Sequence, residues 1–104
     1  MALIKETQLL QHDSNFLLKY GFTFGEDKGP QGECGYTNTY FHSNNTERLW
    51  VTVDFENGIV YFYNEYECGG LLSQWTEDIP DNVKYCEYPF IEWLNEQIPE
   101  EMSN

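Results

Sequence analysis

Two alternating segments around an Asn-Gly pair constrain the fold of this chain more than any other feature. Apolar and polar residues alternate from Leu49 to Phe55, and a second run rich in aromatic and β-branched residues extends from Ile59 to Tyr66. Such runs predict β-strands. Asn57 and Gly58 between them are the favoured pair for a type I′ turn, because both central residues of that turn need positive φ. The sequence therefore predicts an antiparallel hairpin.

Further segments extend this hairpin into a sheet. Tyr36–His42 predicts a strand before it, and Leu71–Trp75 predicts a fourth strand after it. Val83–Cys86 is expected to be a fifth, shorter edge strand. Residues 25–35 are rich in glycine and hold a proline, which predicts a loop. This loop lacks the spacing of phosphate-binding motifs, and its acidic residues would repel phosphate.

Helical segments are expected at both ends of the chain. Residues 2–20 carry an apolar stripe and read as helical, in one or two pieces. The C-terminal helix is predicted to open near Tyr88, with Pro89 in its first turn, and to end at Pro99. The predicted fold class is α+β, with an N-terminal helical segment, an antiparallel sheet of three to five strands and a C-terminal helix, all in a single domain of residues 1–104.

The strand from Ile59 to Tyr66 is apolar or aromatic on both faces. Tyr61 and Tyr63 share one face, and Val60 and Phe62 share the other. If both helical segments pack on one face, the tyrosine face is open to solvent and becomes a candidate interface. The alternative is that a helix or the long loop covers each face, so that all these rings belong to the core.

The formal net charge is −13, from 18 Asp and Glu against 5 Lys and Arg. Residues 1–25 sum to zero, so residues 26–104 carry the whole excess. Disordered acidic tails are poor in aromatic residues, whereas this chain has 7 Phe, 8 Tyr and 3 Trp. The charge is therefore expected on a folded surface. The basic residues are too few and too scattered for direct nucleic-acid binding.

Signatures of catalysis and of metal binding are weak. Asp54 with Glu56, and Glu65 with Glu67, are carboxylate pairs that could bind a divalent cation, but a chain this acidic forms such pairs by chance. Neither histidine stands in a nucleophile motif. The sequence predicts a protein that is not an enzyme and that has no cofactor and no metal site.

The cysteines and the N-terminal residues indicate where in the cell the protein is expected. Cys34, Cys68 and Cys86 have neither CxxC nor zinc-knuckle spacing, which predicts buried or half-buried free thiols. A Cys68 to Cys86 bridge and a metal cluster with His42 are the alternatives. Residues 1–6 show no secretion signal, and no apolar run is long enough to span a bilayer, so we expect a cytoplasmic protein without membrane contact.

These features predict a small acidic interaction protein. The expected function is that of an inhibitor or immunity-type protein that blocks a basic, nucleic-acid-binding surface of a larger partner such as a nuclease or effector, because complementary potentials steer association. Phage anti-defence proteins, including anti-CRISPR inhibitors, share this small, acidic, motif-free profile. The likeness is one of profile and not of family.

Two other functions fit the same sequence. One is an accessory domain whose acidity serves only solubility, and the other is a metal-dependent enzyme built on carboxylates. A homodimer is also compatible with the sequence. The residues predicted to bind the partner alternate charge and rings around the sheet. They are Asp54, Glu56, Tyr63, Glu65, Tyr66, Glu67, Trp75, Glu77, Asp78 and Asp81.

Overall fold

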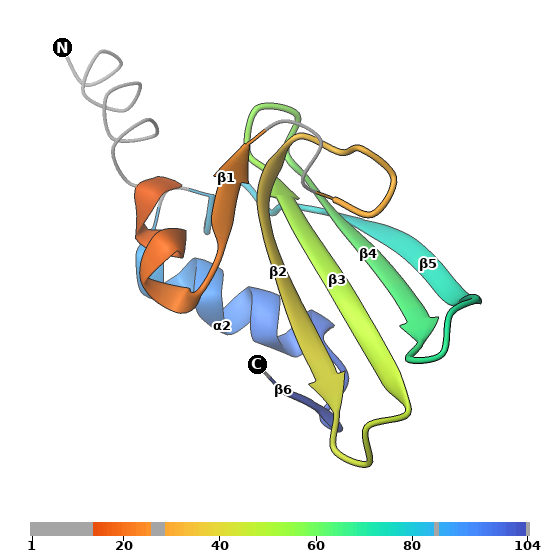
Figure 1. The fold of residues 1–104 in the computed structure, drawn as a ribbon. Helices are drawn as coiled ribbons and strands as arrows, with labels where there is room; N and C mark the ends of the chain where they lie inside the picture. Colours follow the sequence, from red (N-terminus) through yellow and green to blue (C-terminus); the bar gives the residue numbers. More distant parts are fainter. Residues whose placement is uncertain (1–13, 26–28, 85, 104) are drawn as a thin grey trace, which may run out of the picture.

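The structure is a computed structural model that describes residues 14–25, 29–84 and 86–103. An antiparallel sheet dominates it, with one α-helix near the C-terminus (Figure 1). This arrangement confirms the α+β class. In chain order the elements are the 3₁₀ helix η1 (Ser14–Tyr20), β1 (Thr23–Gly25), β2 (Gly35–His42), β3 (Glu47–Asp54), β4 (Ile59–Tyr66), β5 (Leu71–Asp78), α2 (Glu87–Gln97) and β6 (Met102–Ser103).

The first five strands lie side by side in chain order, and each is antiparallel to the next. β6 also pairs with β2, at Phe41 and His42, whereas β1 pairs with the other end of β2, from Gly35 to Thr37. Since β3 occupies one side of β2, β1 and β6 share the other side. One edge of the sheet is therefore two short strands, and the other edge is the eight-residue β5.

The β3–β4 hairpin is confirmed, but the prediction of a type I′ turn is wrong. Asp54 pairs with Ile59, which leaves a four-residue loop of residues 55–58. Within that loop positive φ is confined to Gly58, at 69°. The Asp54 carboxylate accepts hydrogen bonds from the Asn57 backbone N–H at 3.1 Å and from Asn57 Nδ2 at 2.7 Å. This local cap favours a longer loop of the kind built around a type I turn.

One face of the sheet carries the core. Directly opposite residues share a face, so Val51 of β3 and Phe62 of β4 point to the same side, and both are buried. Phe90 and Leu94 of α2 and Leu17 of η1 are buried in the same cluster. Figure 1 shows η1 and α2 together on one side of the sheet. The predicted C-terminal helix is thus confirmed, with Phe90 and Leu94 as its buried residues.

Other boundaries differ from the predictions. Of residues 2–20, predicted to be helical, Ser14–Tyr20 form a 3₁₀ helix and residues 2–13 lie outside the described part. Val83–Cys86 was predicted to be a strand, but residues 81–84 form a turn in which the Val83 N–H donates to the Pro80 carbonyl at 3.1 Å. That i to i+3 bond curls the backbone, so it cannot run alongside β5.

Gly35 marks the start of β2 and explains why the loop ends there. Its φ is +139°, and a Cβ at this position would overlap the Val53 carbonyl oxygen. Only glycine fits such a backbone, which lies against the neighbouring strand.

Within the described residues, no helix is long and apolar enough to cross a membrane.

Candidate interaction surface

The face of the sheet opposite η1 and α2 presents aromatic side chains. Trp50 pairs with Tyr63, and Thr52 pairs with Tyr61, so all four point away from the helices. Trp50, Tyr61 and Tyr63 are half-buried. We call this surface the open face. As in the first of the two sequence interpretations, both helical elements lie on one side of the sheet. The loop before β2, however, covers part of the open face.

A charged cluster lies on the open face where β3 and β4 pair. The Glu65 carboxylate accepts hydrogen bonds from Trp50 Nε1 at 3.0 Å and from Arg48 Nε at 2.9 Å. Arg48 Nη2 also forms an ion pair with it at 2.7 Å. The indole hydrogen bond, together with Arg48, lowers the pKa of Glu65 below its ordinary value, although partial desolvation opposes this. The Glu65 charge is therefore compensated within the protein.

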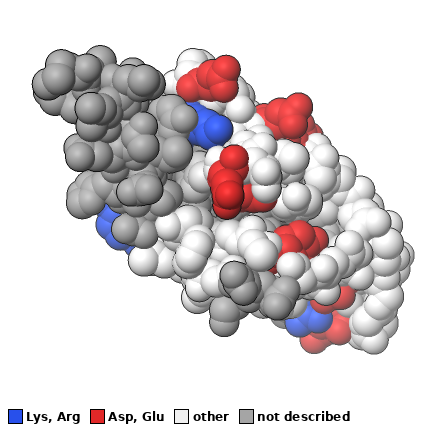
Figure 2. All heavy atoms as spheres, turned by 90° about the horizontal axis from the view of Figure 1, so that it is seen from above, with Lys and Arg blue, Asp and Glu red and all other residues white. Residues whose placement is uncertain are grey.

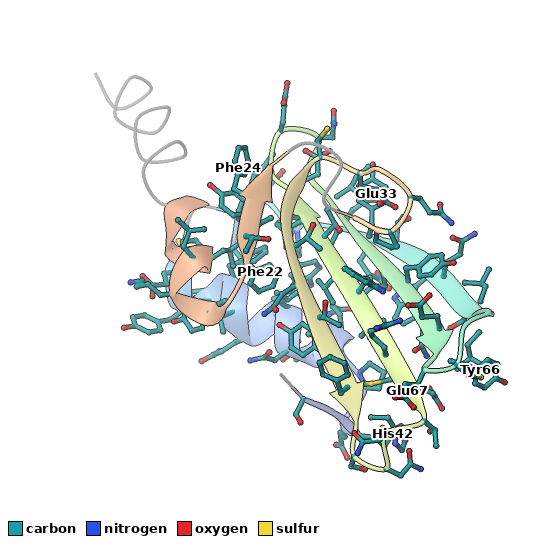
Figure 3. The ribbon with its side chains drawn as sticks, in the orientation of Figure 1. Phe22, Phe24, Glu33, His42, Tyr66 and Glu67 are labelled. Atoms are coloured by element: carbon teal, nitrogen blue, oxygen red, sulfur yellow. The ribbon has the colours of Figure 1, made fainter. Side chains whose placement is uncertain are left out.

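The loop before β2 folds over the open face near β4 and β5. Gln31 Nε2 donates to Gln74 Oε1 at 3.0 Å, and the Gln31 backbone N–H donates to the Glu33 carboxylate at 3.1 Å. Figure 3 shows Glu33 on this loop. A hollow of about 450 Å³ lies between the loop and the strands. It is lined by Gln31, Glu33, Tyr61, Phe62, Tyr63, Gln74, Trp75 and Thr76.

Half of the predicted partner-binding residues gather at the end of the sheet that holds the β3–β4 turn. The register pairs Ile59 with both Asp54 and Asp78, and the Ile79 N–H donates to the Gly58 carbonyl at 2.9 Å. We call the set collected there the acidic end. It consists of Asp54, Glu56, Glu77, Asp78 and Asp81.

Figure 2 looks down on the molecule from the side of that turn. It shows acidic side chains standing apart from one another on largely uncharged surface, with basic side chains among them. Lys84 reaches this region, because its Nζ lies 3.5 Å from where a Cβ of Gly58 would be. The acidic end is thus negative overall, but it is not uniformly so.

The other predicted residues do not join the acidic end. Glu65 and the exposed Tyr66 close β4, and Glu67 lies in the following turn, at the opposite end of the strand, roughly 20 Å away at about 3.3 Å per residue. Figure 3 shows Tyr66 and Glu67 there. Trp75 points to the helix side, where its ring stacks on Phe62 with centroids 4.9 Å apart.

The cysteine prediction is wrong in part. Cys34, Cys68 and Cys86 are free thiols, as expected, but all three are exposed because they lie in loops or beside α2 and not on the core face. The Cys68 to Cys86 bridge is therefore absent. In the described ranges, no group of three or more His, Cys, Asp or Glu side chains is placed to hold a metal ion.

Sequence reasoning missed several residues of the open face. Trp50 and Arg48 were not among the predicted contacts, although the alternation of β3 places both on the side of Tyr63. Gln31 and Glu33 belong to a loop without periodicity, so no sequence signal placed them over the sheet.

Comparisons of the chain with protein-family models, with curated proteins and with solved structures found no match.

Proposed function

We propose that the protein is a non-enzymatic interaction protein of the inhibitor or immunity type, whose acidic end blocks a basic, nucleic-acid-binding surface of a larger partner. The observation that carries the proposal is the strand register, which brings Asp54 and Asp78 together on the open face at one end of the sheet and places Glu77 at the same end on the helix side. Glu56 and Asp81 lie in the turns at that end. A surface that binds phosphates is rich in Lys and Arg, so it attracts such a group of carboxylates.

The way these charges are held supports binding. Asp54 is fixed by two hydrogen bonds from Asn57, and Glu77 and Asp78 are carried by a paired strand. Charges that are already positioned lose less conformational entropy when a partner binds. The ion pairs found for Lys19 and Arg48 go to Glu87 and Glu65, which lie outside the acidic end.

A domain that is acidic only for solubility explains less of the surface. Such a domain gains nothing from Trp50, Tyr61 and Tyr63 on an open face, whereas aromatic side chains are enriched in protein interfaces. The proposal of a carboxylate-based metal enzyme has no geometric support among the described residues.

The test begins with affinity capture of the partner from the native host, followed by measurement of its Kd for three forms of the full chain. The first is the wild type. The second neutralises the acidic end and carries E56Q, E77Q, D78N and D81N. The third is a matched control with the same change in net charge and carries E92Q, E96Q, E100Q and E101Q.

We expect the acidic-end variant to bind at least about tenfold more weakly than the wild type, which is ~1.4 kcal/mol. The control should change much less, because its charges lie on α2 and the segment after it. Asp54 is left unchanged so that the hairpin cap is kept. Equal weakening of the two variants would show that only the net charge matters, and it would contradict the proposal.

A further inference from the structure

The two edges of the sheet are protected very differently. The edge formed by β1 and β6 consists of strands of three and two residues. β5 is eight residues long, and its side chains are exposed or half-buried. Natural sheets protect edges with short strands, Lys or Pro. β5 has no Lys and no Pro, and its charged residues are confined to Glu77 and Asp78 at its end, so residues 71–76 of this edge are suited to pairing with another strand.

The hydrogen-bond pattern tells which groups of β5 are available. The Ile79 N–H donates to Gly58 just before β4, so by antiparallel alternation Glu77, Trp75 and Ser73 face β4 with their backbone groups. The backbone groups of Gln74, Thr76 and Asp78 then point outward. Among the described residues, no strand lies beyond β5.

The hollow of about 450 Å³ lies on the open face next to this edge. Tyr61 and Tyr63 contribute aromatic rings, and the Glu33 carboxylate contributes a negative charge. An aromatic face and a carboxylate together attract a lysine or arginine side chain. Gln74 and Thr76 line the hollow and also belong to the free edge, so the two features meet.

We propose that β5 is a docking edge for an extended segment of the basic partner, which joins the sheet as an additional strand and inserts a Lys or Arg side chain into this hollow. Alternate side chains of the added strand lie on the open face, about 5 Å from Gln74 and Thr76, within reach of a long cationic side chain. The basic character of the segment rests on the proposed function.

Charge favours a partner over a second copy of this chain. Two copies would bring together net charges of −13 each. Residues 71–78 also contain no basic side chain that could enter the hollow of the other copy. The complementary occupant is therefore a cationic strand.

The probe is a capped seven-residue peptide of alternating Lys and Val, which places every Lys on one face of a strand. Its control has Glu in place of Lys. Backbone amide shifts and hydrogen exchange of the ¹⁵N-labelled full chain locate binding. With the Lys peptide we expect shifts and slower exchange, by about tenfold or more, at Gln74, Thr76 and Asp78. The Glu peptide should have no effect.

Three variants separate the edge from the hollow. T76P removes an outward N–H, which an edge strand tolerates, and should abolish peptide binding. T76V keeps the N–H and should bind as the wild type does, and its circular dichroism checks that position 76 accepts substitution. E33Q keeps the shape of the hollow without its charge and should weaken binding of the Lys peptide.

Shifts confined to other elements, or equal binding by T76P and T76V, would overturn the docking edge. A dimer of the wild type that T76P abolishes would instead identify a second copy as the occupant, and it would overturn the proposed one.

If T76P still binds the captured partner as the wild type does while the acidic-end variant does not, the proposed function holds without this edge. If the Lys peptide docks on β5 but no captured partner binds through the acidic end, only the docking edge holds.

Discussion

Trp50 donates its indole N–H to the Glu65 carboxylate at 3.0 Å, across the pairing of β3 and β4. Arg48 binds the same carboxylate and lies 5.7 Å from the centre of the Trp50 ring. Glu65 was predicted to contact a partner as an acidic residue. Because Trp50 and Arg48 already compensate the charge of this carboxylate, Glu65 is better suited to holding these two side chains on the open face than to contacting a partner.

Replacing Glu65 with Gln should lower the free energy of unfolding by about 1 kcal/mol at neutral pH, since an ion pair and charged hydrogen bonds are lost at a partly exposed site. Urea denaturation measures the change. E67Q, in the exposed turn next to β4, is the control and should stay within about 0.5 kcal/mol of the wild type. Equal effects of the two substitutions would show that the cluster adds nothing to stability.

The Glu65 site also predicts how the stability of the folded protein changes at acid pH. The folded state lowers the pKa of Glu65, so its stabilisation is present above the pKa of an unfolded Glu, about 4.3, and is lost as pH falls through the lower folded pKa. The stability difference between the wild type and E65Q should therefore shrink below about pH 4. Urea denaturation at stepped pH measures it, and a difference that is constant down to about pH 2 would contradict the role of this carboxylate.

Tyr40 predicts how the stability of the folded protein changes at alkaline pH. Burial raises its pKa to about 12, partly opposed by a hydrogen bond with Asn38. Between about pH 10 and pH 12 the unfolded state ionises while the folded state stays protonated, so stability should fall by about 2 to 3 kcal/mol. The Y40F variant should lack this part of the loss, as measured by urea denaturation at stepped pH. Parallel curves for the two proteins would contradict the assignment.

Gly35 should tolerate no side chain. G35A places a methyl against the Val53 carbonyl at a φ of +139°, so we expect a loss of about 1 to 3 kcal/mol. Gly70 is a matched control because its φ is also positive, at 101°, while nothing lies within 4 Å of its missing Cβ. Thermal unfolding should show a larger loss for G35A than for G70A. If the two losses are equal, the close approach of residue 35 to β3 contributes nothing to the loss of stability.

Added salt should stabilise the protein. Neighbouring carboxylates repel one another, and salt screens that repulsion over a Debye length of about 8 Å at physiological ionic strength. We expect the thermal midpoint to rise by several degrees with added NaCl, and the acidic-end variant to show a smaller rise. A midpoint that is flat or falls with salt would contradict a crowded acidic surface.

The hairpin could be predicted because its signal is local. The alternation around Val51 and Phe62 fixes which side chains are buried. Its turn could not be predicted from Asn57 and Gly58 alone, because the Asp54 carboxylate binds Asn57 and stabilises a longer loop. Strands as short as β1 and β6 contain too few residues to show a period, so they depend on pairing with β2.

The acidic end illustrates a different limit. Asp54 and Asp78 are far apart in sequence, and only the registers of β3 with β4 and of β4 with β5 bring both opposite Ile59. The sequence identified these carboxylates as candidates but could not separate them from Glu65 and Glu67 at the other end of the sheet. Register is a long-range property, so the composition of each strand does not reveal it.

The most direct test of the central claim is displacement of nucleic acid from the captured partner by the wild type and the two charge variants, between about 50 and about 500 mM NaCl. Docking through the acidic end predicts that the wild type displaces the nucleic acid, that displacement weakens steeply with salt, and that the acidic-end variant needs at least about tenfold more protein than the α2 control. Displacement that does not depend on salt, or that is the same for both variants, would contradict it.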